Sequence, residues 1–250
     1  MAINDLVGLS AISAVLAPLD GGGPRTDAVV HRLTAAIGLG VMVDGEQLPS
    51  ETDLSAQLGV STVTLREALA VLREQGLVST RRGRGGGSFI NASADSIQNS
   101  SLSRLRRLST EELRDLGDEH RAVSGAAAAL AAERSLAADV ARLRGLIDRL
   151  REGDGPTEIR RADSRFHIEV AVSSQSARLT RAEVNLQSEI SPLIWLPQVA
   201  VDRESEVGEH QALVDAIESE DAVLARDLAE AHEARHIRRL IELRMELIAQ

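Results

Sequence analysis

Residues 48–88 read LPSETDLSAQLGVSTVTLREALAVLREQGLVSTRRGRGGGS and contain two short helical patterns separated by a turn. Ser50 precedes the first pattern and Asp53 follows three residues later, a spacing much like that of a capping box. Residues 59–61 supply the turn, and the second helix is predicted at about residues 62–75. Apolar side chains recur in it at helical spacing and are predicted to face inward: Val63, Leu65, Ala68, Leu69 and Leu72. Two helices this short and this close predict a helix-turn-helix, whose second helix is offered to the major groove of DNA.

The start of the second helix and the segment after it carry the candidate DNA contacts. Arg66 lies off the buried stripe and has the planar fork that pairs with guanine O6 and N7. Residues 77–80 and 88–90 read as two strands, with an arginine- and glycine-rich hairpin tip at residues 81–87. Arginines at such a tip would lie beside phosphates or reach into the minor groove. The candidate contacts from the residues alone are Ser61, Thr62, Val63, Arg66, Arg81, Arg82 and Arg84.

This segment resembles the winged-helix DNA-binding domain of the GntR family of bacterial transcription regulators. The resemblance covers about residues 25–90 and rests on LPSE, LGVS at the turn, TLREAL, GLV and the RRGRGGG tip. Many relatives carry a DNA-contacting arginine after LPSE, where this chain has Thr52, so we expect a weaker contact there or a different half-site. The resemblance implies DNA contacts at Ser61, Thr62, Val63, Arg66, Arg82, Gly83 and Arg84.

The arginine- and glycine-rich tip could instead be a solvated loop or a phosphate-binding loop. A phosphate-binding loop is disfavoured because no Lys-Ser or Lys-Thr follows the glycines, and the whole chain contains no lysine. Residues 1–107 hold 10 Arg and 10 Asp plus Glu (net 0), whereas residues 108–250 hold 18 Arg and 28 acids (net −10). Residues 60–90 hold 5 Arg and 2 Glu (net +3), which favours DNA binding by a confined basic face.

A chain of 250 residues is long enough for two modest domains. Its aromatic residues are Trp195, Phe89 and Phe166, and the abundance of alanine and leucine favours packed helices over a sheet-rich fold. The sequence has no cysteine and so no disulfide, which suits the cytoplasm, where we expect the protein to act. Polar residues interrupt the apolar stretch at residues 3–19 and no basic start precedes it, so neither a signal peptide nor a membrane span is predicted.

Four regions are predicted along the chain. Residues 1–24 form an N-terminal extension of unknown role, residues 25–90 the winged helix-turn-helix, and residues 91–107 a linker rich in small polar side chains. Residues 108–250 show long helical patterns with short breaks, which predicts an all-α antiparallel bundle. Its helices are expected at residues 112–134, 138–151, 157–173, 179–190, 203–219 and 221–248. The fold class is therefore mainly α, with a small β-wing.

Four residues of the predicted bundle form a candidate metal site. Asp163 and His167 lie four residues apart and so project from one face of a helix. His210 lies about as far before the turn near residues 220–221 as His232 lies after it, which places the two side by side in an antiparallel hairpin. One carboxylate and three imidazoles suit zinc, nickel, manganese or iron. Taken alone, the pattern also fits histidines that are ordinary buried core residues.

Residues 108–250 resemble the all-helical FCD effector-binding domain, which follows the winged helix in the FadR-like branch of the GntR family. The resemblance rests on D-x3-H, on E-H-x6-I at residues 209–217 and on an alanine-rich turn before the last histidine. It implies that a divalent transition metal, for which we expect zinc, is held by Asp163, His167, His210 and His232.

The first helix of this module departs from the family. Many relatives have an arginine there that helps to hold an acidic effector, and a glutamate one turn on. In this chain His120 or Arg121 takes the place of the arginine, and Ser124 that of the glutamate. Ser176 stands where an asparagine is common, and His236 is expected outside the metal shell, facing solvent or a partner helix.

These features together predict a ligand-responsive repressor. A homodimer would present two winged helices to a palindromic DNA operator. A small organic acid would bind with its carboxylate on the metal and on Arg121, and would shift the population between two placements of the winged helices. A metal sensor whose effector is the ion, and a metal-dependent enzyme with a DNA-binding head, are the alternatives. The enzyme is disfavoured because Asp118 and Glu119 are the only acid–base candidates, and nothing places them by the metal.

Overall fold

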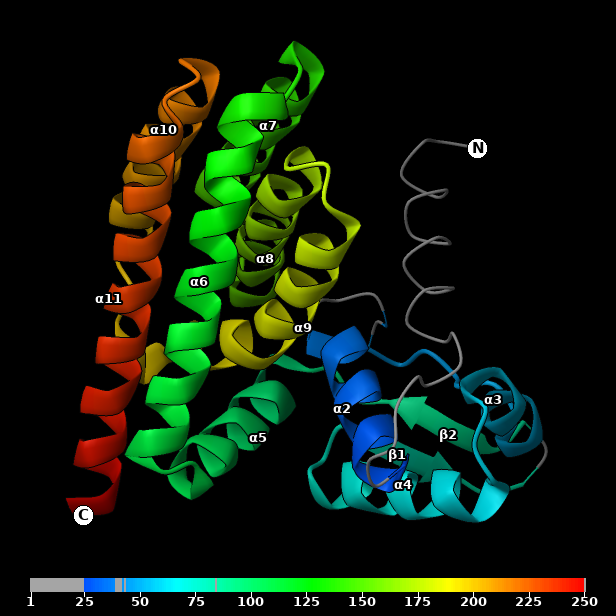
Figure 1. Cartoon of the computed structure of the whole chain (residues 1–250). Coiled ribbons are helices and arrows are strands. Elements are labelled where there is room, and N and C mark those ends of the chain that lie inside the picture. The colour runs from blue at the N-terminus through cyan, green and yellow to red at the C-terminus, as the bar shows by residue number, and fades with distance from the viewer. Residues whose placement is uncertain (1–24, 39–41, 43, 84, 250) are drawn as a thin grey trace. The chain divides into compact units, whose positions relative to one another are not determined.

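The computed structural model describes residues 25–38, 42, 44–83 and 85–249 (Figure 1). They form two compact units, whose boundary along the chain lies between Ser100 and Ser101. The predicted N-terminal extension at residues 1–24 and the candidate DNA contact Arg84 lie outside the described residues.

The first unit contains the predicted helix-turn-helix. Ser50 caps the first helix of the motif by accepting a hydrogen bond from the Asp53 N–H at 3.2 Å, and Gly59 ends it with a left-handed φ of 68°. Ser61 caps the second helix in the same way, accepting from the Thr64 N–H at 3.1 Å. The helices are α2 (Arg25–Gly38), α3 (Glu51–Leu58) and α4 (Thr62–Glu74).

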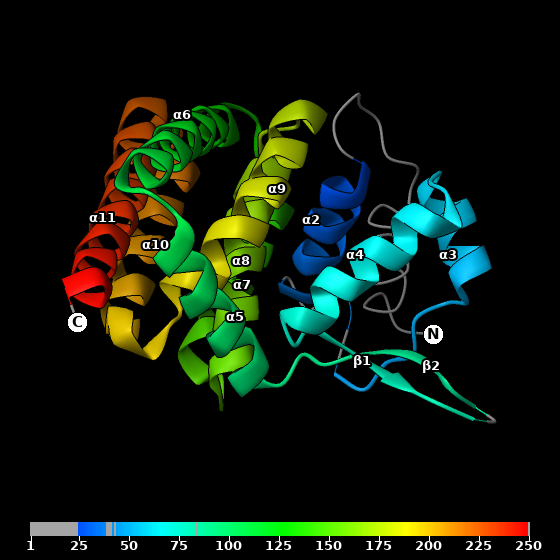
Figure 2. The ribbon, with the colours of Figure 1, turned by 90° about the horizontal axis from the view of Figure 1, so that it is seen from below.

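The wing follows α4 as an antiparallel hairpin of β1 (Val78–Arg81) and β2 (Gly87–Ile90) (Figure 2). Its register pairs Val78 with Ile90 and Arg81 with Gly87. Arg81 and Gly87, predicted to belong to the tip, are therefore the last and first residues of the two strands. The hairpin and the helices share one apolar core, which holds the unit together. That core includes Val29, Leu33, Leu54, Leu65, Leu69, Leu72 and Ile90.

The predicted linker at residues 91–107 is largely helical. Helix α5 (Ala94–Arg107) begins after Ser93, whose hydroxyl accepts a hydrogen bond from the Ser96 N–H at 3.2 Å. Ile97 is buried in the core of the first unit, and Leu105, two turns on, in a core of the second. An apolar face at this spacing stabilises a helix even where serine and asparagine dominate the composition.

The second unit continues as an all-α bundle, in agreement with the predicted fold class. Its helices are α6 (Thr110–Arg134), α7 (Ala137–Glu152), α8 (Pro156–Ser173), α9 (Ala177–Ile194), α10 (Arg203–Glu218) and α11 (Ala222–Ala249). Helix α9 runs past its predicted end and contains Pro192. Within the described residues, no helix is long and apolar enough to cross a membrane.

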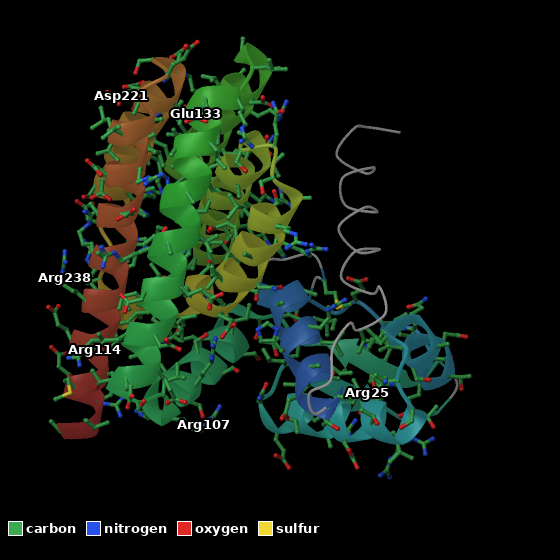
Figure 3. The ribbon with its side chains drawn as sticks, viewed as in Figure 1. Arg25, Arg107, Arg114, Glu133, Asp221 and Arg238 are labelled. Atoms are coloured by element: carbon green, nitrogen blue, oxygen red, sulfur yellow. The ribbon has the colours of Figure 1, made fainter. Side chains whose placement is uncertain are left out.

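Helices α6 and α11 lie side by side along the bundle (Figure 1). Gly117 permits this approach, because a Cβ atom there would lie 2.5 Å from Cγ1 of Ile237. Charged side chains of the same two helices, among them Arg114 and Arg238, point outward (Figure 3). The bundle therefore has a solvated outer face and an interior built of Leu143, Phe166, Val214 and their neighbours.

Candidate nucleic-acid interface and metal centre

The start of α4 presents the predicted DNA-contacting side chains to solvent. Ser61, Thr62 and Arg66 are exposed, and the exposed fraction of Val63 is 62%. The inward orientation predicted for Val63 is therefore wrong: it lies on the exposed face of the helix, where a thymine methyl group could be contacted. The Arg66 side chain is 67% exposed, and its Nε donates to Oε2 of Glu51 at 2.6 Å.

The wing adds further cations to the first unit. The guanidinium of Arg81 lies over the ring of Phe89, 4.4 Å from its centroid, which fixes its direction. Arg82 and Gly83 are exposed at the tip, and Thr52 is exposed on α3. This unit thus offers a helix start and a basic hairpin, the two parts with which a winged helix contacts the major groove and the phosphate backbone.

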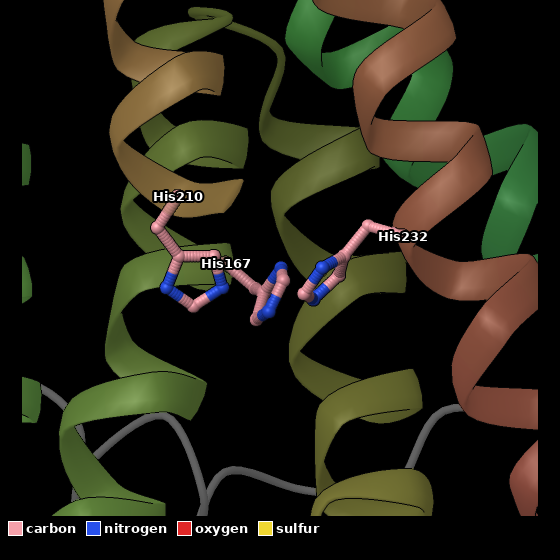
Figure 4. A group of neighbouring side chains, drawn as sticks. All are labelled: His167, His210 and His232. Atoms are coloured by element: carbon pink, nitrogen blue, oxygen red, sulfur yellow. The ribbon is translucent and has the colours of Figure 1, made fainter. Parts of the chain in front are cut away.

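The second unit brings three histidines together from three helices. His167 of α8, His210 of α10 and His232 of α11 converge in the bundle interior (Figure 4). Their ring centroids lie 5.0 Å apart for His167 and His210, 5.1 Å for His167 and His232, and 5.0 Å for His210 and His232. Oδ1 of Asp163 lies 3.7 Å from Nε2 of His167 and 3.6 Å from Nε2 of His210. All four predicted residues therefore meet at one place.

Neighbouring side chains hold these groups in position. The ring of Phe166 stacks on His210 with a centroid distance of 4.0 Å. Trp195 Nε1 donates to Oδ2 of Asp163 at 2.8 Å, which leaves Oδ1 facing the histidines. Nδ1 of His232 lies 2.7 Å from Oε2 of Glu209, which leaves Nε2 facing inward. Such outer partners typically orient the ligands of a metal.

Three of the four candidate ligands direct a buried polar atom into the cluster that finds no partner among the described residues. Among the described residues, Asp163 Oδ1, His210 Nε2 and His232 Nε2 make no hydrogen bond. Buried polar atoms are rarely left unsatisfied, so such a convergence needs an explanation. One carboxylate oxygen and three imidazole nitrogens are a donor set that fits a divalent transition metal.

The electrostatics of the cluster keep two of its imidazoles neutral. Burial, together with the neighbouring His236, lowers the pKa of His232 to about 3. Burial and the nearby His167 hold the pKa of His210 well below its usual value. For His167 burial acts in the same direction, but Asp163 and Glu233 outweigh it and raise the pKa. A neutral imidazole is the form that binds a metal ion, so the donors of His210 and His232 need lose no proton at neutral pH.

A layer of buried carboxylates beside the histidines was missed by the sequence analysis. His120 lies between two of them, with Nε2 3.0 Å from Oε1 of Glu183 and Nδ1 2.8 Å from Oε2 of Glu233. Burial opposes protonation of His120, but these carboxylates outweigh it and raise its pKa to about 10. By contrast, the acid–base candidates named from the sequence, Asp118 and Glu119, are exposed. Glu233 directly follows a predicted ligand, which is a signal that could have identified it.

His236 is also part of this buried layer. It is 3% exposed, and its Nε2 lies 3.0 Å from Oε2 of Glu206. It was expected to face solvent or a partner helix, and the structure shows the second: the register of α10 and α11 turns it toward Glu206 of α10. Glu206 precedes His210 by one helical turn, and this spacing could have pointed to it.

Comparison with known proteins gives the family of the chain. Residues 25–87 match the family described as bacterial regulatory proteins, gntR family, and residues 115–235 match the FCD domain. A Mycobacterium gastri protein described as the HTH-type transcriptional regulator RmpR is 42% identical over 89% of this chain and 82% of its own length. The chain belongs to the GntR family. This GntR-family protein is therefore a transcription regulator, with a DNA-binding helix-turn-helix and an FCD domain, and not an enzyme.

A further relative agrees with the assignment, and a solved structure has the same fold. A protein of Escherichia coli strain K12, described as an L-lactate dehydrogenase operon regulatory protein, is 31% identical over 83% of both chains. The crystal structure of a GntR-family regulator from Pseudomonas syringae pv. tomato superposes with a TM-score of 0.52 at 19% identity, covering 100% of this chain and 98% of the other. The latter supports the fold.

The two residues suggested for effector binding in this GntR-family protein lie in different surroundings. Arg121 is 44% exposed, and its guanidinium lies 3.9 Å from carboxylates of Asp118 and Glu230. His120 is buried and contacts Glu183 and Glu233. Both carboxylates line a small cavity beside the histidines, formed by Ser124, Ala127, His167, Val170, Glu183, Leu213, Ala229, His232 and Glu233.

Proposed function

We propose that this GntR-family protein is a repressor that binds a palindromic operator as a homodimer and responds to a small organic acid bound at a metal in the bundle. The observation that carries the proposal is the convergence of Asp163, His167, His210 and His232, with buried donor atoms that find no partner among the described residues. A site of this kind in the FCD domain, joined in one chain to an exposed recognition helix, fits a ligand-controlled DNA switch.

In this proposal the four residues hold a divalent transition ion, with zinc the first candidate. Two or more imidazoles with one carboxylate suit zinc, and nickel, manganese or iron accept the same donors. When bound, such an ion supplies a Lewis-acidic position that a carboxylate can occupy. The chain itself contributes the orientation of the donors: Trp195 turns Asp163, and Glu209 turns His232.

The organic acid is supported by a relative and by the position of the cavity. One relative is described as regulating an L-lactate dehydrogenase operon, and lactate is a small hydroxy acid. The cavity is lined by His167 and His232, and also by Ser124 and Glu183. A ligand there would contact the proposed metal and polar side chains of α6 and α9 at the same time.

DNA binding by a homodimer follows from symmetry. Two copies of α4 related by a twofold axis require two half-sites with the same relation, which is a palindrome. The effector would favour one of two placements of the recognition helices, and only one placement would match the half-site spacing. Its coupling free energy is expected at about 1–3 kcal/mol, the usual range for such linkage.

Fluorescence anisotropy with operator DNA tests this proposal. A duplex selected from a random pool would be titrated with metal-free protein, with zinc-loaded protein, and with zinc plus L-lactate or another small carboxylate. We expect a change in operator affinity of about 5- to 150-fold that requires both zinc and the carboxylate, and its loss in Asp163→Asn. Equal affinity in all three states, for every carboxylate in the panel, would contradict the proposed control.

The size of the cavity favours a second candidate, a metal sensor whose effector is the ion. The cavity has room for about one water molecule, so an organic acid requires the side chains around it to move. In a metal sensor, zinc alone would produce the full change in operator affinity, and carboxylates would add nothing. The same titration distinguishes the two.

A further inference from the structure

Helices α10 and α11 face each other with two pairs of side chains of metal-ligating type, one helical turn apart; each pair, one residue from each helix, is called a rung. Glu206 and His210 are four residues apart on α10, and His232 and His236 are four residues apart on α11. The antiparallel register sets His210 beside His232, with ring centroids 5.0 Å apart. It also sets Glu206 beside His236, with Oε2 and Nε2 3.0 Å apart. The first rung belongs to the proposed metal centre, whereas the second has no part in it.

The donors of the second rung, together with His232, converge as closely as the three histidines of the proposed metal centre. Oε2 of Glu206 lies 3.6 Å from Nε2 of His232, and one ligand atom from each of Glu206, His232 and His236 lies within 4.8 Å of the others. All three residues are at most 5% exposed. Oε1 of Glu206 accepts from Arg239 at 3.0 Å, so the other oxygen points toward the histidines.

The shared residue, His232, has one donor atom available to either rung. Its Nδ1 is held by Glu209 at 2.7 Å. Its Nε2 is buried and makes no hydrogen bond within the described part of the chain, although it lies between the two groups of ligands. A single donor atom of this kind can complete one coordination shell at a time.

We propose that Glu206, His232 and His236 form a second position for a divalent transition metal. The two positions cannot be occupied at the same time, because both require Nε2 of His232. Two imidazoles and one carboxylate are the three protein ligands of many zinc sites that keep one position open. Zinc at the second position would tie α10 to α11 one turn away from Asp163 and His167. The position rests in part on the proposed metal centre, since it shares a ligand with it.

Zinc binding by the full-length protein tests the proposal, measured by competition with a chromophoric chelator. Asp163→Asn is nearly isosteric and removes a ligand of the first position only. His236→Gln keeps an N–H donor toward Glu206 but removes the imidazole, and so affects the second position only. Glu204→Gln, an exposed charge change on α10, is the matched control. Far-ultraviolet circular dichroism establishes that each variant retains its helices.

We expect wild-type protein and the Glu204→Gln control to bind one zinc equally well. Asp163→Asn should retain weaker binding, and adding His236→Gln should weaken it by a further factor of more than about 10. His232→Ala should lose both positions. Replacing zinc with cobalt should give a different visible spectrum in Asp163→Asn than in wild type, because the donor set has changed.

The possible outcomes distinguish the two positions. If the double variant binds zinc as Asp163→Asn does, the second position does not exist, and Glu206, His236 and Arg239 form only a buried ion-pair network. If Asp163→Asn binds like wild type but His236→Gln loses binding, the second position stands and the proposed first centre fails. If neither substitution has an effect, both are wrong.

Discussion

Replacing Arg66 by alanine separates reading of bases from general attraction to DNA. In the unbound protein Arg66 pairs with Glu51 at 2.6 Å, and the two side chains are 67% and 40% exposed. Exposed ion pairs contribute only about 0.2–1 kcal/mol, so Arg66→Ala should leave the fold intact. A bidentate arginine–guanine contact is worth about 1–3 kcal/mol of discrimination between bases. The expected loss of operator affinity is therefore roughly 5- to 150-fold.

The ion pair with Glu51 predicts the opposite effect when Glu51 is the residue replaced. To reach a base, Arg66 must leave Glu51, and the lost pairing offsets part of the gain on DNA. Glu51→Gln should therefore raise operator affinity by up to about fivefold, the equivalent of 1 kcal/mol. It also removes a negative charge next to the DNA-facing helix.

Anisotropy titrations with the selected operator and with base-substituted duplexes measure both effects. Arg73→Ala is the matched control, because it removes an exposed arginine from the last turn of the same helix. Arg66→Ala should relax the preference for one guanine, whereas Arg73→Ala should leave the preference unchanged. An Arg66→Ala variant with unaltered affinity and unaltered base preference would refute the groove assignment.

Three further outcomes are expected. Gly117→Ala should lower the free energy of unfolding by about 1 kcal/mol in urea titrations, because its Cβ would overlap Ile237. Gly145→Ala on α7, where an added Cβ would meet nothing within 4 Å, should raise the free energy of unfolding by about 0.5–1 kcal/mol. A change of the same sign in both variants would contradict the packing described for α6 and α11. Arg82→Ala should weaken binding evenly across DNA sequences and reduce the slope of log K against log salt by about one, and a change confined to one base position would be incompatible with a phosphate contact. Zinc at 100 times its dissociation constant should stabilise the protein by about 2.7 kcal/mol in thermal or urea unfolding, and His232→Ala should abolish this gain; stabilisation that survives the substitution would place the ion elsewhere.

Local pattern was enough to predict the helix-turn-helix and the helices of the bundle. Ser50 and Gly59 act at short range, through a cap and a turn, and their sequence signals were correct. Val63 was harder, because its apolar character fits the buried stripe while its position at the start of α4 exposes it. Helix α5 was concealed by its serine-rich composition, since Ile97, Leu102 and Leu105 are its only large apolar residues and make a weak pattern.

The convergence of the four candidate ligands was predicted from the sequence, but the side chains that surround them were not. The proximity of Asp163 and His167 follows from their spacing within one helix. The proximity of His210 and His232 could be predicted only by assuming where the turn between their two helices falls. The contacts of His236 with Glu206, and of His120 with Glu183, join residues 30 and 63 positions apart. Such contacts depend on the axial register of packed helices, which a periodic pattern does not determine.

The metal content of full-length protein, purified without chelator or affinity tag and measured by plasma mass spectrometry, tests the central claim most directly. We expect close to one equivalent of a divalent transition metal per chain, and a clear loss in His232→Ala, which removes the ligand common to both proposed positions. A folded wild-type protein that binds its operator but contains and accepts no metal would contradict the claim. The histidines of α8, α10 and α11 would then line a metal-free pocket.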